Sequence, residues 1–399
     1  TGSENFNKER RYGWFPSISG GWVPTQYDWY RNLLPFNNFL KFRASWGRVG
    51  NDRLKDENGN DIRFPYLTTL GNVSSTWGTG LAENRTGSMN LKWEVSTKTN
   101  FGIDARFFDD KVDMTVDFFH TKTTDIFQRR ANIPDEGGLS NVLPYANIGS
   151  MKSWGMDGTL AYTHTFNKDM ALTVRGNFTH AENEVIYWEQ SGVNYPYQSN
   201  SGVPYKVQRG LIALGLFKDE DDIKSSPKQT FMDNYRPGDI KYKDVNGDGK
   251  IDKDDVVPLN YSAVPFIQYG FALDWNYKAF RVSILFEGVS KVQYFQGGRG
   301  FYPFLNESRG NLLEMVADPR NRWIPREYAE ANGIDPALAE NPNAKFPRLT
   351  YGENKNNNQE STFWLADGKY LRLKNVDISY RFTNNWLKSR VGVESATLS

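Results

Sequence analysis

Long stretches in which apolar and polar residues alternate constrain this chain more than any other feature. In residues 91–107, the odd positions are mostly apolar or threonine, and the even positions are polar or glycine. Successive side chains of a strand point to opposite faces, so this pattern predicts a strand with one apolar face. The polar segment 108–111 predicts a short turn, and the alternation resumes over 112–118. These residues therefore predict one long antiparallel hairpin.

The same pattern recurs along the chain. It predicts a second hairpin that turns at 167–169, a third that turns at 278–279, and further strands near residues 40 and 370. In the last of these strands, Arg372 and Lys374 interrupt an apolar series, which predicts a bulge or a register change. The predicted strands have about 10 residues or more, whereas about 5–6 is the commonest length in globular proteins. A membrane-spanning strand needs about 9–11 residues.

The connections between the predicted strands are unequal. Turns of two to four residues alternate with long polar stretches at about 122–153, 181–265 and 290–362. Short turns at one end and long loops at the other are typical of outer-membrane barrels. We therefore predict an all-β fold, an antiparallel transmembrane β-barrel with long extracellular loops and short periplasmic turns. The alternative is a soluble β-domain, whose apolar faces would pack on each other.

Composition excludes several other classes of protein. The 48 Lys and Arg residues balance 47 Asp and Glu residues, for a net charge of +1, which argues against a nucleic-acid partner. The chain has no cysteine, so it has neither thiolate metal sites nor a cysteine nucleophile. Its three histidines lack metal-ligand spacing, and no G-x-S-x-G nucleophile elbow occurs. We expect no enzymatic activity.

Seven segments, in this order along the chain, carry a family resemblance: 12–22, 40–51, 91–104, 147–151, 237–242, 244–249 and 363–376. With them, nearly the whole chain resembles the SusC/RagA-like TonB-dependent outer-membrane transporters of Bacteroidetes-type bacteria. The resemblance implies that residues 1–399 form the later part of a 22-stranded barrel, about half of it. The plug domain and the final strands are expected to lie outside this segment.

The resemblance also implies a function. Such transporters import nutrients across the outer membrane of Gram-negative bacteria. A SusD-like surface lipoprotein covers the barrel, and TonB acts on the transporter through the plug region. The implied cargo is an oligosaccharide or, less favoured, a peptide. The alternatives are a passive porin-like barrel and a soluble β-rich glycan-binding module.

Residues 244–255 form the sharpest local motif, because they follow the spacing of an EF-hand calcium loop. In this interpretation the ligands are Asp244, Asn246, Asp248, the Lys250 carbonyl, Asp252 and Asp255. Position 12 of such a loop normally holds a longer glutamate, and no flanking helices are evident. A bound Ca²⁺ would be structural. The alternative is a polar turn, since Asp, Asn and Gly also favour turns.

Aromatic residues in the predicted loops are candidates for binding cargo, because sugar rings present apolar faces to such side chains. They are Trp77, Tyr187, Trp188, Tyr195, Tyr197, Tyr205, Tyr302 and Trp364. The alternative for each is loop packing or a position at the membrane interface. Charged residues on the polar faces of the strands are expected to line a wet lumen or contact the plug. They include Asp104, Arg106, Asp113, Asp117, Arg175, Arg281 and Glu287.

Overall fold

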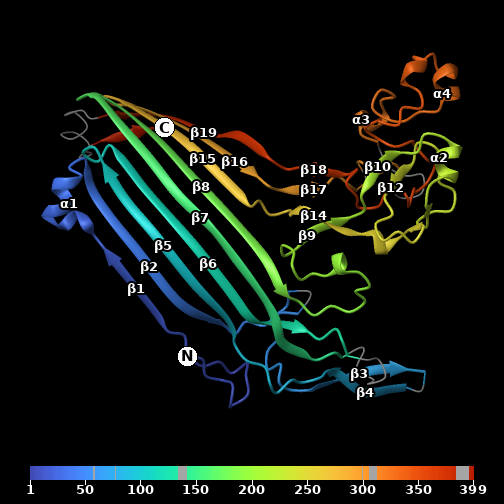
Figure 1. The fold of residues 1–399 in the computed structure, drawn as a ribbon, viewed down its shortest axis with the longest axis horizontal. Helices are drawn as coiled ribbons and strands as arrows, with labels where there is room; N and C mark the ends of the chain where they lie inside the picture. Colours follow the sequence, from blue (N-terminus) through green and yellow to red (C-terminus); the bar gives the residue numbers. More distant parts are fainter. Residues whose placement is uncertain (57–58, 77, 134–141, 299, 305–311, 383–394) are drawn as a thin grey trace.

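A single curved sheet dominates the computed structural model, which describes residues 1–56, 59–76, 78–133, 142–298, 300–304, 312–382 and 395–399 (Figure 1). Within these residues the sheet has ten strands, and every strand pairs antiparallel with its neighbours. In order across the sheet they are β1 (Ser17–Trp22), β2 (Asn37–Asn51), β5 (Glu94–Phe107), β6 (Val112–Arg129), β7 (Tyr145–Asn167), β8 (Met170–Tyr187), β15 (Ile267–Tyr277), β16 (Phe280–Ser290), β19 (Tyr370–Phe382) and β20 (Ala396–Leu398).

The three predicted hairpins are confirmed. Ile103 lies opposite Val116, and Phe271 lies opposite Phe286, so the apolar series of paired strands share one face. The predicted turns at 108–111, 167–169 and 278–279 join these strands, and they lie at one end of the sheet with helix α1 (Asp28–Leu33) (Figure 1). The long connections lie at the other end.

The predicted loop bounds are wrong where strands continue past them. Strand β6 extends to Arg129 and β7 begins at Tyr145, so most of 122–153 is paired strand. Strand β8 likewise extends to Tyr187, within the predicted loop 181–265, and Met151 pairs with Val185. Backbone hydrogen bonds hold these strand ends, but regular alternation is lost there, because residues 121–125 are all polar and register shifts interrupt the pairing near Ile126 and Met151.

The outer face of the sheet is apolar and uncovered. The side chains that form it are exposed, among them Leu160, Phe166, Val174, Phe178, Phe271, Trp275, Phe280, Val376 and Ile378. An apolar surface of this extent on a sheet indicates contact with lipid or with another protein. In the described residues no second apolar face packs over it. None of the described helices is long and apolar enough to cross a membrane.

The opposite face carries charge networks that run across strands. Arg43 of β2 donates to both carboxylate oxygens of Asp104 (2.8 and 2.9 Å) and of Asp117 (3.0 and 2.8 Å). Gly102 lies beneath the guanidinium, and a Cβ there would be 2.6 Å from both Arg43 Cζ and Asp117 Oδ1. The missing side chain at Gly102 therefore makes the room in which these pairs form.

A second network on this face centres on Asp274 of β15, which is buried. Its carboxylate pairs with Arg175 and accepts hydrogen bonds from Arg281 (3.1 Å) and Ser283 (2.8 Å). A buried carboxylate is stable only with such partners. The prediction that charged residues share the polar face is confirmed for these groups.

The predicted irregularity near Lys374 is a β-bulge. Leu285 pairs with Asn375 while the next residue, Phe286, pairs with Leu373, so Lys374 is the extra residue in β19. Arg372 and Lys374 both contact Glu287 of β16 (3.2 and 2.7 Å). The bulge thus brings both cations to one carboxylate and moves the apolar series from odd to even positions.

The long connections contain structure of their own. They form a hairpin, β3 (Thr69–Ser75) and β4 (Gly78–Arg85), which the sequence pattern did not predict, and a set of short elements. These are η3 (Pro196–Gln198), β9 (Val207–Gly210), β10 (Ala213–Leu216), α2 (Glu220–Lys224), β11 (Lys228–Gln229), β12 (Ile240–Tyr242), β13 (Lys250–Ile251), η4 (Lys253–Asp255), β14 (Val257–Ser262), β17 (Gln293–Phe295), α3 (Glu314–Ala317), α4 (Arg326–Ala331), η5 (Pro336–Leu338) and β18 (Leu365–Asp367); η1 (Pro24–Gln26) precedes α1.

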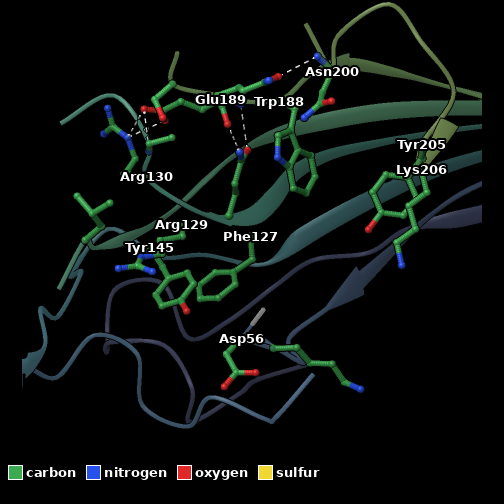
Figure 2. A pocket seen from close by; sticks show the side chains of 16 residues that line it. Asp56, Phe127, Arg129, Arg130, Tyr145, Trp188, Glu189, Asn200, Tyr205 and Lys206 are labelled. Atoms are coloured by element: carbon green, nitrogen blue, oxygen red, sulfur yellow. Dashed lines mark hydrogen bonds and ion pairs between the residues drawn. The ribbon is translucent and has the colours of Figure 1, made fainter. Parts of the chain in front are cut away.

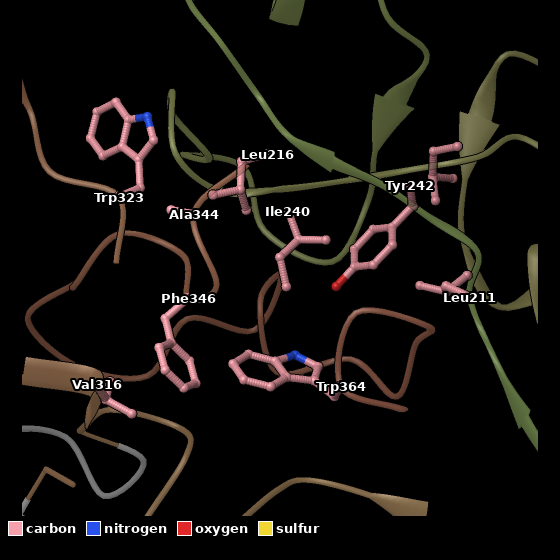
Figure 3. Packing of buried hydrophobic residues seen from close by; sticks show 10 residues of the cluster. Leu211, Leu216, Ile240, Tyr242, Val316, Trp323, Ala344, Phe346 and Trp364 are labelled. Carbon is pink, nitrogen blue, oxygen red and sulfur yellow. The ribbon is translucent and has the colours of Figure 1, made fainter. Parts of the chain in front are cut away.

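Two of these connections pack together at the end of the sheet (Figure 1). We call their described residues in 207–262 and 293–364 the loop domain. Its core is a cluster of buried apolar side chains from both connections (Figure 3): Leu211, Leu216, Ile240, Tyr242, Ile251, Val316, Trp323, Ala344, Phe346 and Trp364. A core of this size gives the loop domain a fixed shape.

Asp239, which is fully buried, ties the two connections together by hydrogen bonds. Its carboxylate accepts from Arg348 (2.9 Å), Asn354 (3.0 Å) and Asn357 (2.8 Å). Burial also raises the pKa of the Tyr242 hydroxyl, which donates to the carbonyl of Asn356 (2.7 Å). The loop domain therefore combines an apolar core with two buried polar groups, Asp239 and the Tyr242 hydroxyl, that are hydrogen-bonded.

Candidate functional site

A hollow of about 730 Å³ lies where strands β6 and β7 meet the segment that follows β8 (Figure 2). We call it the junction pocket. It is lined by Lys55, Asp56, Phe127, Gln128, Arg129, Arg130, Ala131, Leu143, Tyr145, Trp188, Glu189, Gln190, Ser191, Asn200, Tyr205 and Lys206. Its position at the loop end of the sheet places it between the wall and the loops.

Aromatic rings form the apolar walls of the junction pocket. Phe127 and Tyr145 stack with ring centroids 4.6 Å apart and planes 7° apart, because their strands pair at this point. The ring centroids of Trp188 and Tyr205 are 6.2 Å apart, and the Tyr205 side chain is exposed (Figure 2). The sequence predicted Trp188 and Tyr205 as cargo-binding aromatics, and the structure brings them together. It missed Phe127 and Tyr145, whose stacking depends on the pairing of β6 with β7 in a stretch where no strand was predicted.

A buried clamp fixes the pocket's polar side. The Glu189 carboxylate accepts hydrogen bonds from Arg130 Nε (2.8 Å) and from the amide of Asn132 (2.9 Å), and the Gln128 side chain donates to the Glu189 carbonyl (2.6 Å). Burial raises the pKa of Glu189, but the hydrogen bonds from Asn132, Arg130 and Ala131 outweigh it and hold the pKa below its usual value. Glu189 is therefore an anion at neutral pH. Sequence reasoning missed it, because one glutamate among 47 acidic residues carries no signal.

This arrangement suits binding. Flat rings flanked by amide and charged side chains can hold an extended ligand, with the rings against its apolar faces and Gln190 and Asn200 as hydrogen-bonding groups. The geometry supports recognition of a ligand.

The other predicted aromatics lie elsewhere. Tyr195 and Tyr197 stack on each other (5.4 Å, 6°), and the Tyr197 hydroxyl donates to the Asp254 carbonyl (2.6 Å). Burial and the nearby carboxylates raise the pKa of Tyr197, so its hydroxyl remains a donor. Trp364 is 2% exposed and half-buried Tyr302 packs on it, so the structure places both in or beside the loop-domain core. Tyr187 is exposed at the end of β8, and Trp77 lies outside the described residues.

The predicted calcium loop is an ordered turn beside the two tyrosines. The Asp244 carboxylate accepts from the amides of Gly247 (2.6 Å) and Gly249 (2.9 Å), and Asn246 donates to the Tyr195 hydroxyl (3.1 Å). Buried Asp255 accepts from two backbone amides of the same loop.

Five of the six predicted ligand residues thus form hydrogen bonds within this loop or to Tyr195. They are Asp244, Asn246, Asp248, Asp252 and Asp255. Lys250 begins β13, where it pairs with Lys228. In the described residues, no three acidic or histidine side chains lie together as a metal-binding group. The calcium site stays a prediction.

The fold and the site together define a class. A long-stranded antiparallel sheet with one apolar exposed face, one charged face, short turns at one end and a loop domain at the other is a section of a β-barrel wall with its loops. Residues 1–398 match the family described as TonB dependent receptor-like, beta-barrel. The chain belongs to this family, and the resemblance inferred from the sequence is confirmed.

Known proteins agree with this assignment. The chain is 26% identical over its full length to TonB-dependent receptor P26 of Formosa agariphila, and 23% identical over 96% of its length to TonB-dependent receptor SusC of Bacteroides thetaiotaomicron. It spans 38% and 36% of those proteins. A structure of the RagAB peptide transporter shares the fold, with a TM-score of 0.72 and 22% identity over 99% of this chain and 40% of that one.

Proposed function

We propose that this chain is part of the wall, lumen and outer loops of a TonB-dependent, SusC-like importer in the outer membrane of a Gram-negative bacterium. The two-faced sheet carries the proposal. Its exposed apolar face suits lipid, and its charged face suits a water-filled or plugged lumen. Transport, with no catalysis of its own, is the function that follows.

Cargo and partners belong to the same proposal. We favour an oligosaccharide, which the sequence resemblance implies; a peptide is the second candidate, because the structurally similar RagAB is a peptide transporter. A SusD-like surface lipoprotein would close over the loop domain, and TonB would act through a plug region. The passive porin-like barrel is the alternative, and it lacks any requirement for TonB.

The test is fractionation of the natural parent protein, with its co-purifying partners identified. Recovery in detergent-extracted outer membranes, together with a lipoprotein and with uptake that stops when TonB is deleted, is the expected result. Uptake that continues without TonB would support the porin, and recovery as a soluble protein would refute the barrel proposal.

Within the importer, we propose that the junction pocket contacts cargo through Trp188 and Tyr205. Replacing Trp188 by alanine should weaken cargo binding about tenfold, because one aromatic wall is lost. The matched control is Tyr351→Ala, since Tyr351 is a loop aromatic that is 91% exposed and does not line the pocket. Equal affinities of the two variants would remove the pocket from the proposal.

We also propose a structural Ca²⁺ in residues 244–255, on the spacing of their oxygen ligands. Each carboxylate oxygen has two lone pairs, so the Asp244 oxygens that accept backbone amides can still bind a cation. Ca²⁺ should slow proteolysis of the parent protein within this loop, and the double variant Asp244→Asn/Asp248→Asn should lose that effect. Identical proteolysis in Ca²⁺ and in EDTA would leave only the polar turn.

A further inference from the structure

A second cavity, of about 810 Å³, opens in the loop domain next to its apolar core. Its floor is Trp323, which is 6% exposed and lies at the edge of the core cluster in Figure 3. The indole packs on the turn at Gly238, where a Cβ would lie 2.3 Å from the ring. This close packing fixes the floor, so the cavity is a preformed feature of the domain.

One buried arginine in the wall of this cavity lacks a carboxylate. Arg322 is 7% exposed, donates from Nε to the carbonyl of Ala317 (3.2 Å), and places its guanidinium 5.3 Å from the ring centroid of Tyr328. Within the described part of the chain it forms no ion pair. Buried charges are normally paired, because desolvation of an unpaired ion costs several kcal/mol.

Two more cations line the same cavity without an ion-pair partner among the described residues, Lys218 and Arg236. The lining acids do not neutralise them by contact. Glu340 pairs with Arg326 (3.2 Å), and Asp219 caps helix α2 through the amide of Asp222 (2.7 Å). The third lining acid, Glu220, forms no ion pair with these cations within the described residues. The fourth cation, Arg348, is already bound to buried Asp239. The cavity therefore offers three cations to a ligand.

We propose that this cavity binds the carboxylate or sulfate group of an acidic saccharide, with Arg322 as its main binding residue and Arg236 and Lys218 at the rim. A guanidinium matches the geometry of such oxyanions by donating two parallel hydrogen bonds. Tyr328, an exposed ring beside Arg322, offers the flat apolar surface that a sugar ring requires. The inference rests on the proposed importer function and adds the class of cargo.

The experiment measures binding to the purified full-length parent protein in detergent, with trigalacturonate as the carboxylate probe, a sulfated disaccharide as the sulfate probe and maltotriose as the neutral control. We expect binding of at least one acidic probe, weakened by salt. Arg322→Gln should reduce its affinity about tenfold or more, and Arg322→Lys should lose less. Preference for the carboxylate or the sulfate probe identifies the oxyanion.

Arg320→Gln is the matched control, because Arg320 carries the same charge nearby, pairs with Asp318, and neither residue lines the cavity. It should stay within about twofold of the unchanged protein. If Arg322→Gln fails to fold, Arg236→Gln at the exposed rim tests the same site and should weaken binding several-fold. Equal binding of maltotriose, tighter binding of a glutamate-rich peptide, or an unchanged affinity of the folded cavity variants would overturn the inference. Recovery of the parent in outer membranes with its lipoprotein would still uphold the importer.

Discussion

Replacing Gly102 by alanine tests how the charged face of the sheet is built. The new Cβ would lie 2.6 Å from Arg43 Cζ and from Asp117 Oδ1, and both atoms belong to movable side chains. The strands therefore need not separate. The guanidinium must move, and Arg43 loses its hydrogen bonds to Asp104 and Asp117.

The size of the loss follows from these contacts. Hydrogen bonds to charged groups contribute about 1.5–3 kcal/mol each, but solvent screening reduces this for a side chain that is 32% exposed. We expect Gly102→Ala to lower the free energy of unfolding by about 1–2 kcal/mol relative to Gly176→Ala. Gly176 is the matched control, because its nearest contact would be 3.8 Å away. Alanine there should be neutral or stabilise the strand by about 0.5–1 kcal/mol.

The assay is urea-induced unfolding of the full-length parent in lipid vesicles, followed by tryptophan fluorescence, in a double-mutant cycle with Arg43→Ala. Once the arginine is gone, Gly102→Ala should behave like the control. An equal loss with and without Arg43 would refute the reasoning, because the Cβ would then meet a fixed part of the sheet. No loss in either background would show that the pairs contribute nothing.

Three further predictions concern the loops. The pKa of Glu189 is lowered in the folded state, so its carboxylate stabilises the junction pocket above the unfolded pKa of about 4.3, and this contribution is lost as the pH falls through the folded value. Hydrogen exchange at residues 128–132 should therefore accelerate in acid, and Glu189→Gln should abolish that acceleration; exchange of the unchanged protein without this acid response would contradict the prediction. Asp239→Ala should destabilise the loop domain by about 3–5 kcal/mol, since it removes a fully buried carboxylate and leaves Arg348, whose side chain is 16% exposed, without its partner; fast exchange confined to the loop domain is the expected result, and unchanged protection would contradict the prediction. Trp364→Ala should cost about 3–5 kcal/mol by opening a cavity in the core, measured by the same exchange experiment, and a loss under 1 kcal/mol would mean that the core repacks.

The sequence predicted the sheet well wherever one face is apolar. The hairpins, their turns and the bulge at Lys374 all follow from alternation, because burial in lipid or core acts on every second residue. Part of β6 was missed where adjacent residues, which point to opposite faces, are both polar, as at Lys122 and Thr123. There the backbone pairing alone holds the strand, and composition gives no sign of it.

The loop domain could not be predicted, because its contacts join distant parts of the chain. Asp239 meets Asn354 and Asn357 across more than a hundred residues. Trp364 shows the same limit: an aromatic in a predicted loop was interpreted as a candidate for cargo binding, and the structure buries it. Trp188 and Tyr205 were selected by the same rule and do line a pocket, so the rule identifies aromatic residues but not their surroundings.

The central claim is that one face of this sheet contacts lipid and the other contacts the lumen. The segment has no cysteine, so single cysteines can be placed along β8 of the parent protein, in a background free of other cysteines, within intact outer membranes. Cysteines at Val174 and Phe178 should react only with a lipid-soluble maleimide, and cysteines at Thr173 and Asn177 should react with a water-soluble one. Alternating labelling is the predicted result. Equal labelling of all four positions by the water-soluble reagent would contradict the barrel wall.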